Sequence, residues 1–404
     1  MRVAPGVQPV SGVQLVPAPV PLALYVHMPW CVRKCPYCDF NSHQLKGAAP
    51  PPGYIDALLE DFDSEMPSVA GRRIESVFFG GGTPSLFQPE EFARLLEALR
   101  ARIEFAPDVE ITLEANPGTI ERGQFAGYRA AGINRVSLGA QSFDPRALER
   151  LGRIHATADI HRSVEELHAA GLVNFNLDLM YALPEQTLAQ AVLDVNTACD
   201  LGPAHLSYYQ LTLEAGTVFH ARPPVLPDDE AAWLIQTECQ AILAARGFTQ
   251  YEVSAYAKAG ARCRHNLNYW LFGDYLGVGA GAHGKLSQEL PDRILRSVKP
   301  KQPREYQEQI ASAGFGRGEH QPVGERRLVA SSELPFEFML NALRLNEGFA
   351  VADFEQRTGL ALEVVESALR QAVERGLLEA GAQRFRPTEL GRRFLNDLQA
   401  RFLE

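Results

Sequence analysis

Apolar residues follow two alternating patterns through the first half of the chain. Short runs rich in Val, Ile, Leu, Phe and Tyr are typical of buried strands, and longer segments between them place apolar residues at helical spacing. The strand candidates are residues 22–27, 74–80, 109–115, 133–139, 173–181 and 205–212, and the helix candidates are residues 54–66, 89–103, 124–132, 160–171 and 187–202. This sixfold alternation predicts an α/β fold with a parallel sheet and right-handed crossovers. Six units are too few for a closed eight-stranded barrel, so we expect a partial (β/α)6 barrel.

The pattern changes after about residue 225, and the remaining chain predicts a second domain. A helix is expected over 229–246, followed by a Gly-rich stretch, YLGVGAGAHG, at 275–284. From about 330 the chain gives three helical patterns, a hairpin candidate and a last helix, which together predict a winged-helix-like α+β domain. The predicted division is a poorly ordered tail over 1–21, a barrel with an accessory segment over 22–289, a polar linker over 290–329, and the C-terminal domain over 330–404.

Polar residues end each of the six strand candidates. The second strand runs into the glycines of GGGTP, the third ends at Glu114 and Asn116, the fourth at Gln141 and Ser142, the fifth at Asp178, and the sixth at Gln210 and Glu214. Parallel barrels build their sites from the loops at the C-terminal ends of the strands. Packing alone does not explain polar groups at six successive strand ends, so this face is the predicted active site.

Composition and charge narrow the function further. The 404 residues are 46% hydrophobic and 22% charged, with a formal net charge of −10, which argues against a general nucleic-acid grip because that requires a basic face. No apolar run reaches the length of a membrane span. The first 21 residues contain five prolines and do not resemble a signal peptide. We therefore expect a cytoplasmic protein, in which clustered cysteines indicate metal or redox chemistry.

Three cysteines lie within eight residues, in the loop that follows the first strand. Cys31, Cys35 and Cys38 have the spacing C-x-x-x-C-x-x-C. A structural zinc site would need a fourth ligand, for which His27 and His43 are candidates. A [4Fe–4S] cluster would keep one iron open, and an open iron is useful only if a ligand binds there.

The cysteine spacing, with Tyr37 just before the last cysteine and a Gly-rich second loop, resembles the radical S-adenosylmethionine superfamily. That resemblance implies a [4Fe–4S] cluster on the three cysteines, with S-adenosylmethionine bound at the open iron. Within the superfamily, YVHMPWCVRKCPYCDF, GGGTPS, LEANPG, GINRVSLGAQSF, LGRIH, NFNLDLMYALPEQ, HNLNYW and YLGVGAGAHG resemble the coproporphyrinogen dehydrogenase-like group in fixed order. The residues that the resemblance places around S-adenosylmethionine are Tyr25, Tyr37, Gly81, Gly82, Thr83, Glu114, Gln141, Arg153 and Asp178.

The group has two branches, and Phe40 helps to separate them. The oxygen-independent coproporphyrinogen III dehydrogenases carry a further cysteine two residues after the third, where this chain has Phe40, and a longer segment before the cluster. PWC, CDFNSH and HNLNYW instead resemble the heme chaperone branch. That resemblance implies heme as cargo, apo-hemoproteins such as respiratory cytochromes as recipients, a homodimer, and peripheral contact with membrane complexes.

The motif HNLNYW allows two interpretations. His265 is a candidate axial heme ligand, with Tyr269 and Trp270 stacking on the macrocycle. Alternatively, His265 is a buried histidine and Trp270 belongs to the core. Cys263, two residues before His265, is a second candidate ligand. The other two cysteines, Cys199 and Cys239, lie within helical patterns and are expected to be small buried side chains.

Overall fold

The structure is a computed structural model that describes residues 20–47, 49–118, 123–290, 293–313 and 323–403. Its main feature is a twelve-stranded sheet with the order β14-β13-β12-β11-β1-β4-β5-β6-β7-β8-β10-β9. The strands are β1 (Leu22–Met28), β4 (Arg73–Gly81), β5 (Glu104–Ala115), β6 (Arg135–Gln141), β7 (Phe175–Tyr181), β8 (His205–Gln210), β9 (Thr249–Gln250), β10 (Ala255–Ala257), β11 (Asp274–Val278), β12 (His283–Glu289), β13 (Arg293–Val298) and β14 (Glu325–Val329).

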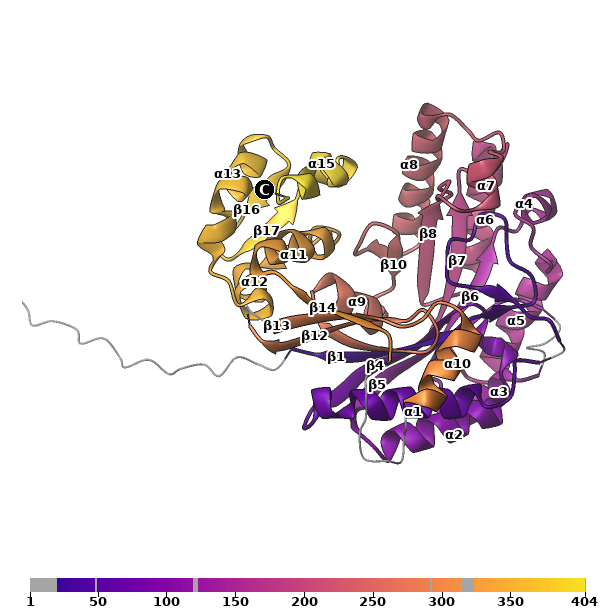
Figure 1. The fold of residues 1–404 in the computed structure, drawn as a ribbon. Coiled ribbons are helices and arrows are strands. Elements are labelled where there is room, and N and C mark those ends of the chain that lie inside the picture. Colours follow the sequence, from indigo (N-terminus) through magenta and orange to yellow (C-terminus); the bar gives the residue numbers. More distant parts are fainter. Residues whose placement is uncertain (1–19, 48, 119–122, 291–292, 314–322, 404) are drawn as a thin grey trace, which may run out of the picture.

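The six predicted strands are confirmed, and they lie side by side in chain order from β1 to β8, all parallel. Nearly every residue of these strands is buried, because both faces of a parallel sheet are covered by other elements. Beyond this parallel core, β11 pairs with β1 in parallel, and β10 pairs with β8 antiparallel. Figure 1 shows the sheet curled, which confirms the partial barrel predicted from the alternation.

The helices between the strands pack outside the curl of the sheet, and α1, α2 and α3 lie together along its outer side (Figure 1). Several begin as their sequences require: Thr187 caps α6 by accepting from Gln190 N–H, and Asp228 caps α8. The helices of this part are α1 (Tyr54–Glu65), α2 (Pro89–Arg100), α3 (Phe125–Ala131), α4 (Pro145–Arg150), α5 (Thr157–Ala169), α6 (Leu188–Asp200), α7 (Val218–Ala221), α8 (Asp229–Ala245), α9 (Arg264–Trp270) and α10 (Pro303–Ser312), with short 3-10 helices at η1 (Met66–Val69) and η2 (Pro84–Leu86).

The polar range 290–329, interpreted from sequence as a linker, carries regular structure. It contains β13, α10 and β14, and β13 pairs antiparallel with both β12 and β14. Tyr306 of α10 is buried against α1, and its hydroxyl donates to Asp61 Oδ2 at 2.8 Å. The linker prediction is wrong for these described residues. Their polar composition reflects the edge strand β14, its neighbour β13 and an outer helix, each of which exposes polar side chains to water. Residues 314–322 lie outside the described residues, as does the predicted tail up to residue 19.

The C-terminal domain has the predicted three helices and hairpin. It comprises η3 (Ser331–Glu333), α11 (Leu334–Ala342), β15 (Phe349–Ala350), α12 (Val351–Thr358), η4 (Leu362–Val365), α13 (Glu366–Glu374), β16 (Leu378–Ala380), β17 (Arg384–Pro387), α14 (Glu389–Arg393) and α15 (Leu395–Ala400). The predicted last helix is divided at Phe394, whose φ and ψ of −112° and 46° are not helical. The small sheet β15-β17-β16 supports the winged-helix-like description. The boundaries at 22, 289 and 330 remain predictions.

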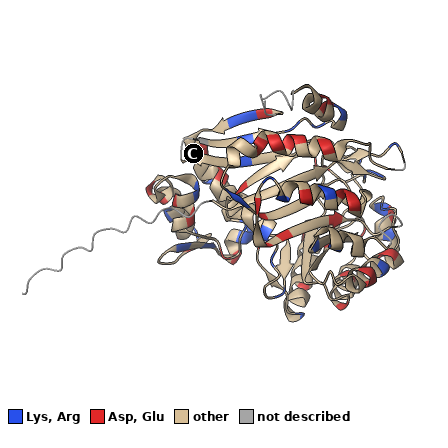
Figure 2. Ribbon diagram, turned by 90° about the horizontal axis from the view of Figure 1, so that it is seen from below, with Lys and Arg blue, Asp and Glu red and all other residues tan. Residues whose placement is uncertain are grey.

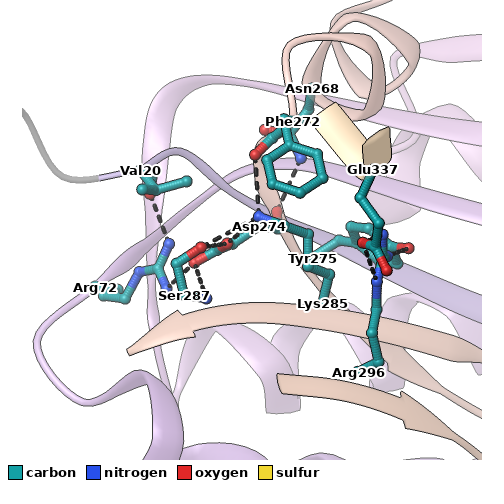
Figure 3. Close-up of polar contacts among 10 residues, drawn as sticks. All are labelled: Val20, Arg72, Asn268, Phe272, Asp274, Tyr275, Lys285, Ser287, Arg296 and Glu337. Atoms are coloured by element: carbon teal, nitrogen blue, oxygen red, sulfur yellow. Dashed lines mark hydrogen bonds and ion pairs between the residues drawn. The ribbon is translucent and has the colours of Figure 1, made fainter. Parts of the chain in front are cut away.

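A buried polar junction joins β11 and β12 to the start of the chain and to the C-terminal domain (Figure 3). Asp274 accepts from Arg72 Nη1 at 2.8 Å and from Lys285 Nζ at 3.1 Å, and both Asp274 and Lys285 are fully buried. Lys285 also donates to Phe272 O and lies 4.0 Å from the centre of the Phe272 ring. Phe272 packs on Phe338 of α11, so the junction links barrel and C-terminal core.

Candidate functional site

The three clustered cysteines lie in the loop after β1, which β2 (Trp30–Cys31) and β3 (His43–Gln44) close into a small two-stranded pair. Cys31, Cys35 and Cys38 are each partly buried, and all three line one cavity at the C-terminal ends of the parallel strands. We call this hollow the cysteine cavity. Burial raises the pKa of the Cys31 and Cys38 thiols, so a bound metal must displace protons from them.

A glycine strip at the end of β4 lines the cavity and packs against the cysteine loop. Gly82 N–H donates to Met28 O at 2.9 Å, and a Cβ placed on Gly82 would lie 2.5 Å from Trp30 O. Gly81 has a φ of +110°, a conformation that favours glycine. Both positions therefore depend on the absence of a side chain, which lets the β4 backbone approach the cysteine loop and line the cavity.

Two carboxyl groups from neighbouring strands point into the same cavity. Gly81 N–H donates to Glu114 Oε2 at 3.1 Å, while Asp178 accepts from Asn176 at 2.8 Å and from Ser137 at 3.2 Å. Burial raises the pKa of Glu114 to about 8, and the nearby Asp178 adds to that shift. Burial also raises the pKa of Asp178, opposed by its hydrogen bonds. Without a bound cation, burial favours the protonated form of Glu114 at neutral pH, so the site suits a positively charged ligand.

A hydrogen-bonded chain links Arg153 to the cysteine loop. Arg153 donates to Asn116 Oδ1 at 2.5 Å and to Gly139 O at 2.8 Å, and its other amino group lies 3.8 Å from Cys35 Sγ. Asn116 in turn donates to Thr83 Oγ1 at 2.8 Å, and Thr83 donates to Cys31 Sγ at 3.5 Å. The guanidinium is therefore held beside the Cys35 thiol, where it suits a carboxylate or a negatively charged cluster.

The structure brings most of the sequence-predicted residues together. Those that line the cysteine cavity are Cys31, Cys35, Cys38, Tyr37, Gly81, Gly82, Thr83, Glu114, Gln141, Arg153 and Asp178. Tyr25 does not line it. That residue lines an adjoining cavity of about 620 Å³, shared with Tyr269 and Tyr275, which we call the tyrosine cavity. Gly81, Glu114, Phe40 and Ser42 border both.

The sequence analysis missed Tyr209, which belongs to the site. It also placed Gln210 and Glu214 at the site, at the end of the sixth strand. Tyr209 lines the cysteine cavity and donates to Gln141 Oε1 at 2.8 Å. Gln210 and Glu214 are exposed and line neither cavity. Successive side chains of a strand point to opposite faces, so the alternation along β8 was the signal that could have selected Tyr209.

The three heme candidates of the HNLNYW motif do not converge on one cavity. His265 is 1% exposed, with Nδ1 hydrogen-bonded to Ser76 Oγ at 3.1 Å and Nε2 to the Tyr269 hydroxyl at 3.2 Å. Its ring stacks on Phe78 with the centroids 5.0 Å apart. Tyr269 lines the tyrosine cavity. Trp270 does not line it: the guanidinium carbon of Arg344 lies over the Trp270 ring, 4.3 Å from the ring centroid.

The other cysteines are buried. Cys263 Sγ donates to Glu110 Oε1 at 3.4 Å, beneath the start of α9, and burial raises its pKa to about 12. Cys199 and Cys239 are buried as the helical patterns predict. Neither of these nor Cys263 lines the cysteine cavity.

The arrangement of donors distinguishes a single metal ion from a cluster. A zinc ion draws all its ligands into one tetrahedron. In the part of the chain that the structure describes, no three His, Cys, Asp or Glu side chains are gathered closely enough to hold one ion. His27 is engaged at both ring nitrogens, by the Tyr25 hydroxyl at 2.9 Å and by Asn41 O at 2.8 Å. Three thiols spread around one cavity fit a cluster better than zinc.

The fold and the cysteine cavity define a radical S-adenosylmethionine protein. Residues 25–196 match the Radical SAM superfamily, and residues 329–394 match the HemN C-terminal domain. The heme chaperone HemW of Escherichia coli (strain K12) is 48% identical over 384 residues, which are 95% of this chain and 98% of that protein. The HemW of Haemophilus influenzae is 46% identical over 387 residues, with 95% and 98% covered. The chain belongs to the HemW family, which confirms the resemblance drawn from its motifs.

One solved structure agrees on the fold. Coproporphyrinogen III oxidase (HemN) from Escherichia coli, described as a radical SAM enzyme, superposes with a TM-score of 0.79 over 95% of this chain and 90% of its own, at 22% identity. At that identity the likeness concerns the fold alone. Among the described residues, no helix is both long and apolar enough to cross a bilayer.

Proposed function

We propose that this protein is a heme chaperone, which binds heme and delivers it to apo-hemoproteins such as respiratory cytochromes. The observation that carries the proposal is the 48% identity, over nearly the full length, to a relative named heme chaperone HemW. Phe40 supports it: this residue stands 61% exposed between the two cavities, where the decarboxylating branch is expected to carry a cysteine.

The chaperone keeps a [4Fe–4S] cluster and S-adenosylmethionine in the cysteine cavity. The thiolates of Cys31, Cys35 and Cys38 would hold the cluster, and the partly buried cavity that they share fits it. When bound, the cluster supplies one-electron chemistry to the sulfonium of S-adenosylmethionine.

The remaining cavity groups bind and orient S-adenosylmethionine in this proposal. Glu114 and Asp178 would accept hydrogen bonds from the ribose hydroxyls and the methionine ammonium, and their raised pKa values fall when a cation approaches. Arg153 suits the carboxylate of the methionine moiety. The full proposed set is Tyr25, Tyr37, Gly81, Gly82, Thr83, Glu114, Gln141, Arg153 and Asp178.

The alternative function is oxygen-independent coproporphyrinogen III dehydrogenation, in which propionates are oxidatively decarboxylated. The fold shared with HemN is compatible with this activity, but a fold alone does not determine a function. The absence of a cysteine at Phe40 stands against it. Measuring the conversion of coproporphyrinogen III therefore distinguishes the two functions.

The test is anaerobic and uses the full chain with its cluster reconstituted. Hemin is titrated first, and we expect a stoichiometric Soret change, followed by heme transfer to an apo-hemoprotein acceptor. Coproporphyrinogen III with S-adenosylmethionine and reductant is then incubated with the same sample. Robust formation of protoporphyrinogen would overturn the chaperone proposal. Cys35→Ala should lower the bound iron, whereas Cys199→Ala, away from the cavity, should not.

The cellular setting follows the same proposal. We expect a cytoplasmic protein that forms a homodimer, contacts membrane complexes peripherally and binds no nucleic acid. Figure 2 shows Lys and Arg residues interspersed with Asp and Glu along the helices. Size-exclusion chromatography with light scattering tests the dimer.

A further inference from the structure

The tyrosine cavity contains more histidine than the cysteine cavity beside it. His27, His43 and His283 all line it, and its volume of about 620 Å³ lies within the roughly 300–1,000 Å³ of typical ligand sites. His283 comes from the end of the Gly-rich stretch YLGVGAGAHG, which the cofactor assignments above leave without a role. We ask which of the three imidazoles is available to a ligand.

Hydrogen bonds occupy two of the three rings. His27 is bonded at both nitrogens, to the Tyr25 hydroxyl and to Asn41 O. His43 Nε2 is bonded to Asn41 Oδ1 at 3.3 Å and to Lys301 O at 3.2 Å. His283 has no side-chain hydrogen bond among the described residues, although it lies at the cavity wall. Among the described residues, His283 is therefore the one of these three imidazoles with no hydrogen bond at either ring nitrogen, whereas His43 keeps only Nδ1 free.

The rest of the cavity has the chemistry that a metalloporphyrin needs. Tyr269 and Tyr275 offer aromatic surface from α9 and β11, and Phe40 stands exposed at the rim. Lys34 and Lys301, both exposed, bring positive charge to the same rim, where propionates would lie. Aromatic walls, a neutral imidazole and peripheral cations correspond to the macrocycle, the iron and the two carboxylates of heme.

We propose that the tyrosine cavity is the heme seat, with His283 as an axial ligand of the iron and Lys34 and Lys301 as partners of the propionates. The inference rests on the proposed chaperone function and differs from the assignment of heme to His265, which is buried. Burial, with Lys301 and Arg296 nearby, lowers the pKa of His283, which keeps the ring neutral as iron ligation requires.

Hydrogen bonds tie this seat to the cysteine loop. Asn41, three residues after Cys38, donates from Nδ2 to Ala280 O and to Lys301 O, both at 2.9 Å. The loop that carries His283 and the segment that carries Lys301 are thus held against the loop that carries the cysteines. His283 also borders a second cavity, under α11, so heme on this ligand would lie between the cluster and the C-terminal domain.

The experiment compares histidine variants of the full, cluster-reconstituted protein with hemin as the probe. His283→Ala should shift the Soret maximum and the resonance Raman spin-state bands, and raise the heme dissociation rate at least tenfold. Added imidazole should restore the wild-type spectrum, which a merely structural role of His283 would not allow. His220→Ala, an exposed histidine on α7 outside both cavities, is the matched control and should behave as wild type.

A second arm tests the propionate contacts. Heme dimethyl ester should bind wild type at least tenfold more weakly than heme, and Lys34→Gln/Lys301→Gln should narrow that difference. If His283→Ala leaves the heme spectrum and the heme dissociation rate unchanged, the assignment of the heme site is wrong but the chaperone proposal stands. The same conclusion follows if wild type binds heme and heme dimethyl ester equally well. If wild type binds no stoichiometric heme, the chaperone function itself fails. His283→Gln, with circular dichroism and iron content as folding checks, covers a poorly folded alanine variant.

Discussion

At the scale of single residues, Glu114 shows how burial sets the charge of the site. Its pKa rises to about 8 because the carboxyl is buried and Asp178 lies nearby. A carboxyl with a raised folded pKa keeps its proton in the folded state while the unfolded chain loses it, so stability falls as pH rises from about 4.5 to about 8. This group alone contributes a loss on the order of 1 kcal/mol per pH unit over that window.

Glu114→Gln should remove that dependence. We expect the cofactor-free variant to equal or exceed the wild type in unfolding free energy at pH 7.5, with a smaller difference at pH 5, as measured by urea titrations at both pH values. The difference between the two proteins reports Glu114 together with its electrostatic coupling to Asp178, because the remaining groups are common to both. A difference that stays constant with pH would contradict the raised pKa.

Gly82 is a second position where one atom decides the geometry. A Cβ there would lie 2.5 Å from Trp30 O and 2.8 Å from Met28 O, and backbone cannot yield as a flexible side chain does. Gly82→Ala should therefore destabilise the fold by about 1–3 kcal/mol and lower the iron bound after reconstitution. Gly47→Ala in the same loop region, where the nearest atom lies at 3.9 Å, is the matched control for the melting temperature and iron content.

At the scale of elements, α9 packs its histidine on the sheet. His265 stacks on Phe78 of β4 and bonds Ser76, and burial lowers its pKa to about 3. A His with a lowered folded pKa costs the fold stability as pH falls below about 6.5, because only the unfolded chain takes up the proton. His265→Ala removes both the packing and this penalty.

We therefore expect His265→Ala to cost about 2–4 kcal/mol at pH 7.5, and about 1 kcal/mol less at pH 5.5. Denaturant unfolding at both pH values measures this. A variant that retains wild-type stability would refute the packing role and return His265 to consideration as a heme ligand. If His265→Ala loses heme binding, its folding must also be measured, because loss of packing alone could cause that result.

The sequence located most elements because their patterns are local. Strands β1 and β4 to β8 and the helices α1, α2 and α6 were predicted from apolar spacing, since a buried strand and an amphipathic helix each leave that signal. The linker over 290–329 was wrong because β14 is the edge strand of the sheet and β13 lies next to it, where exposed polar residues hide the strand signal. Helix α9 was missed because its seven residues give less than two full periods.

At the scale of the whole molecule, the junction in Figure 3 holds the barrel to the C-terminal domain. Lys285 pairs with Asp274 and contacts Phe272, which packs on Phe338. Removing Lys285 leaves the buried Asp274 with Arg72 as its remaining cationic partner and removes the bond to Phe272 O, so Lys285→Met should cost about 1–3 kcal/mol. Lys46→Met, at an exposed lysine, serves as the control. Limited proteolysis should cut the Lys285→Met variant early near the C-terminal domain, and an unchanged digestion pattern would contradict the linking role.

The sequence by itself determined the radical S-adenosylmethionine class and the parallel core. The features that revealed them are local: the spacing of three cysteines, a glycine strip and polar residues at successive strand ends. Local features can be read from the order of residues along the chain. Only the tertiary structure decided which side chains share a cavity. It placed His265 in the core and Tyr209 at the site, and it brought His283 and Lys301 beside the cysteine loop, more than 200 residues away along the chain. Such neighbours are set by the pairing of β11 with β1 across the sheet, a long-range contact that no local pattern encodes.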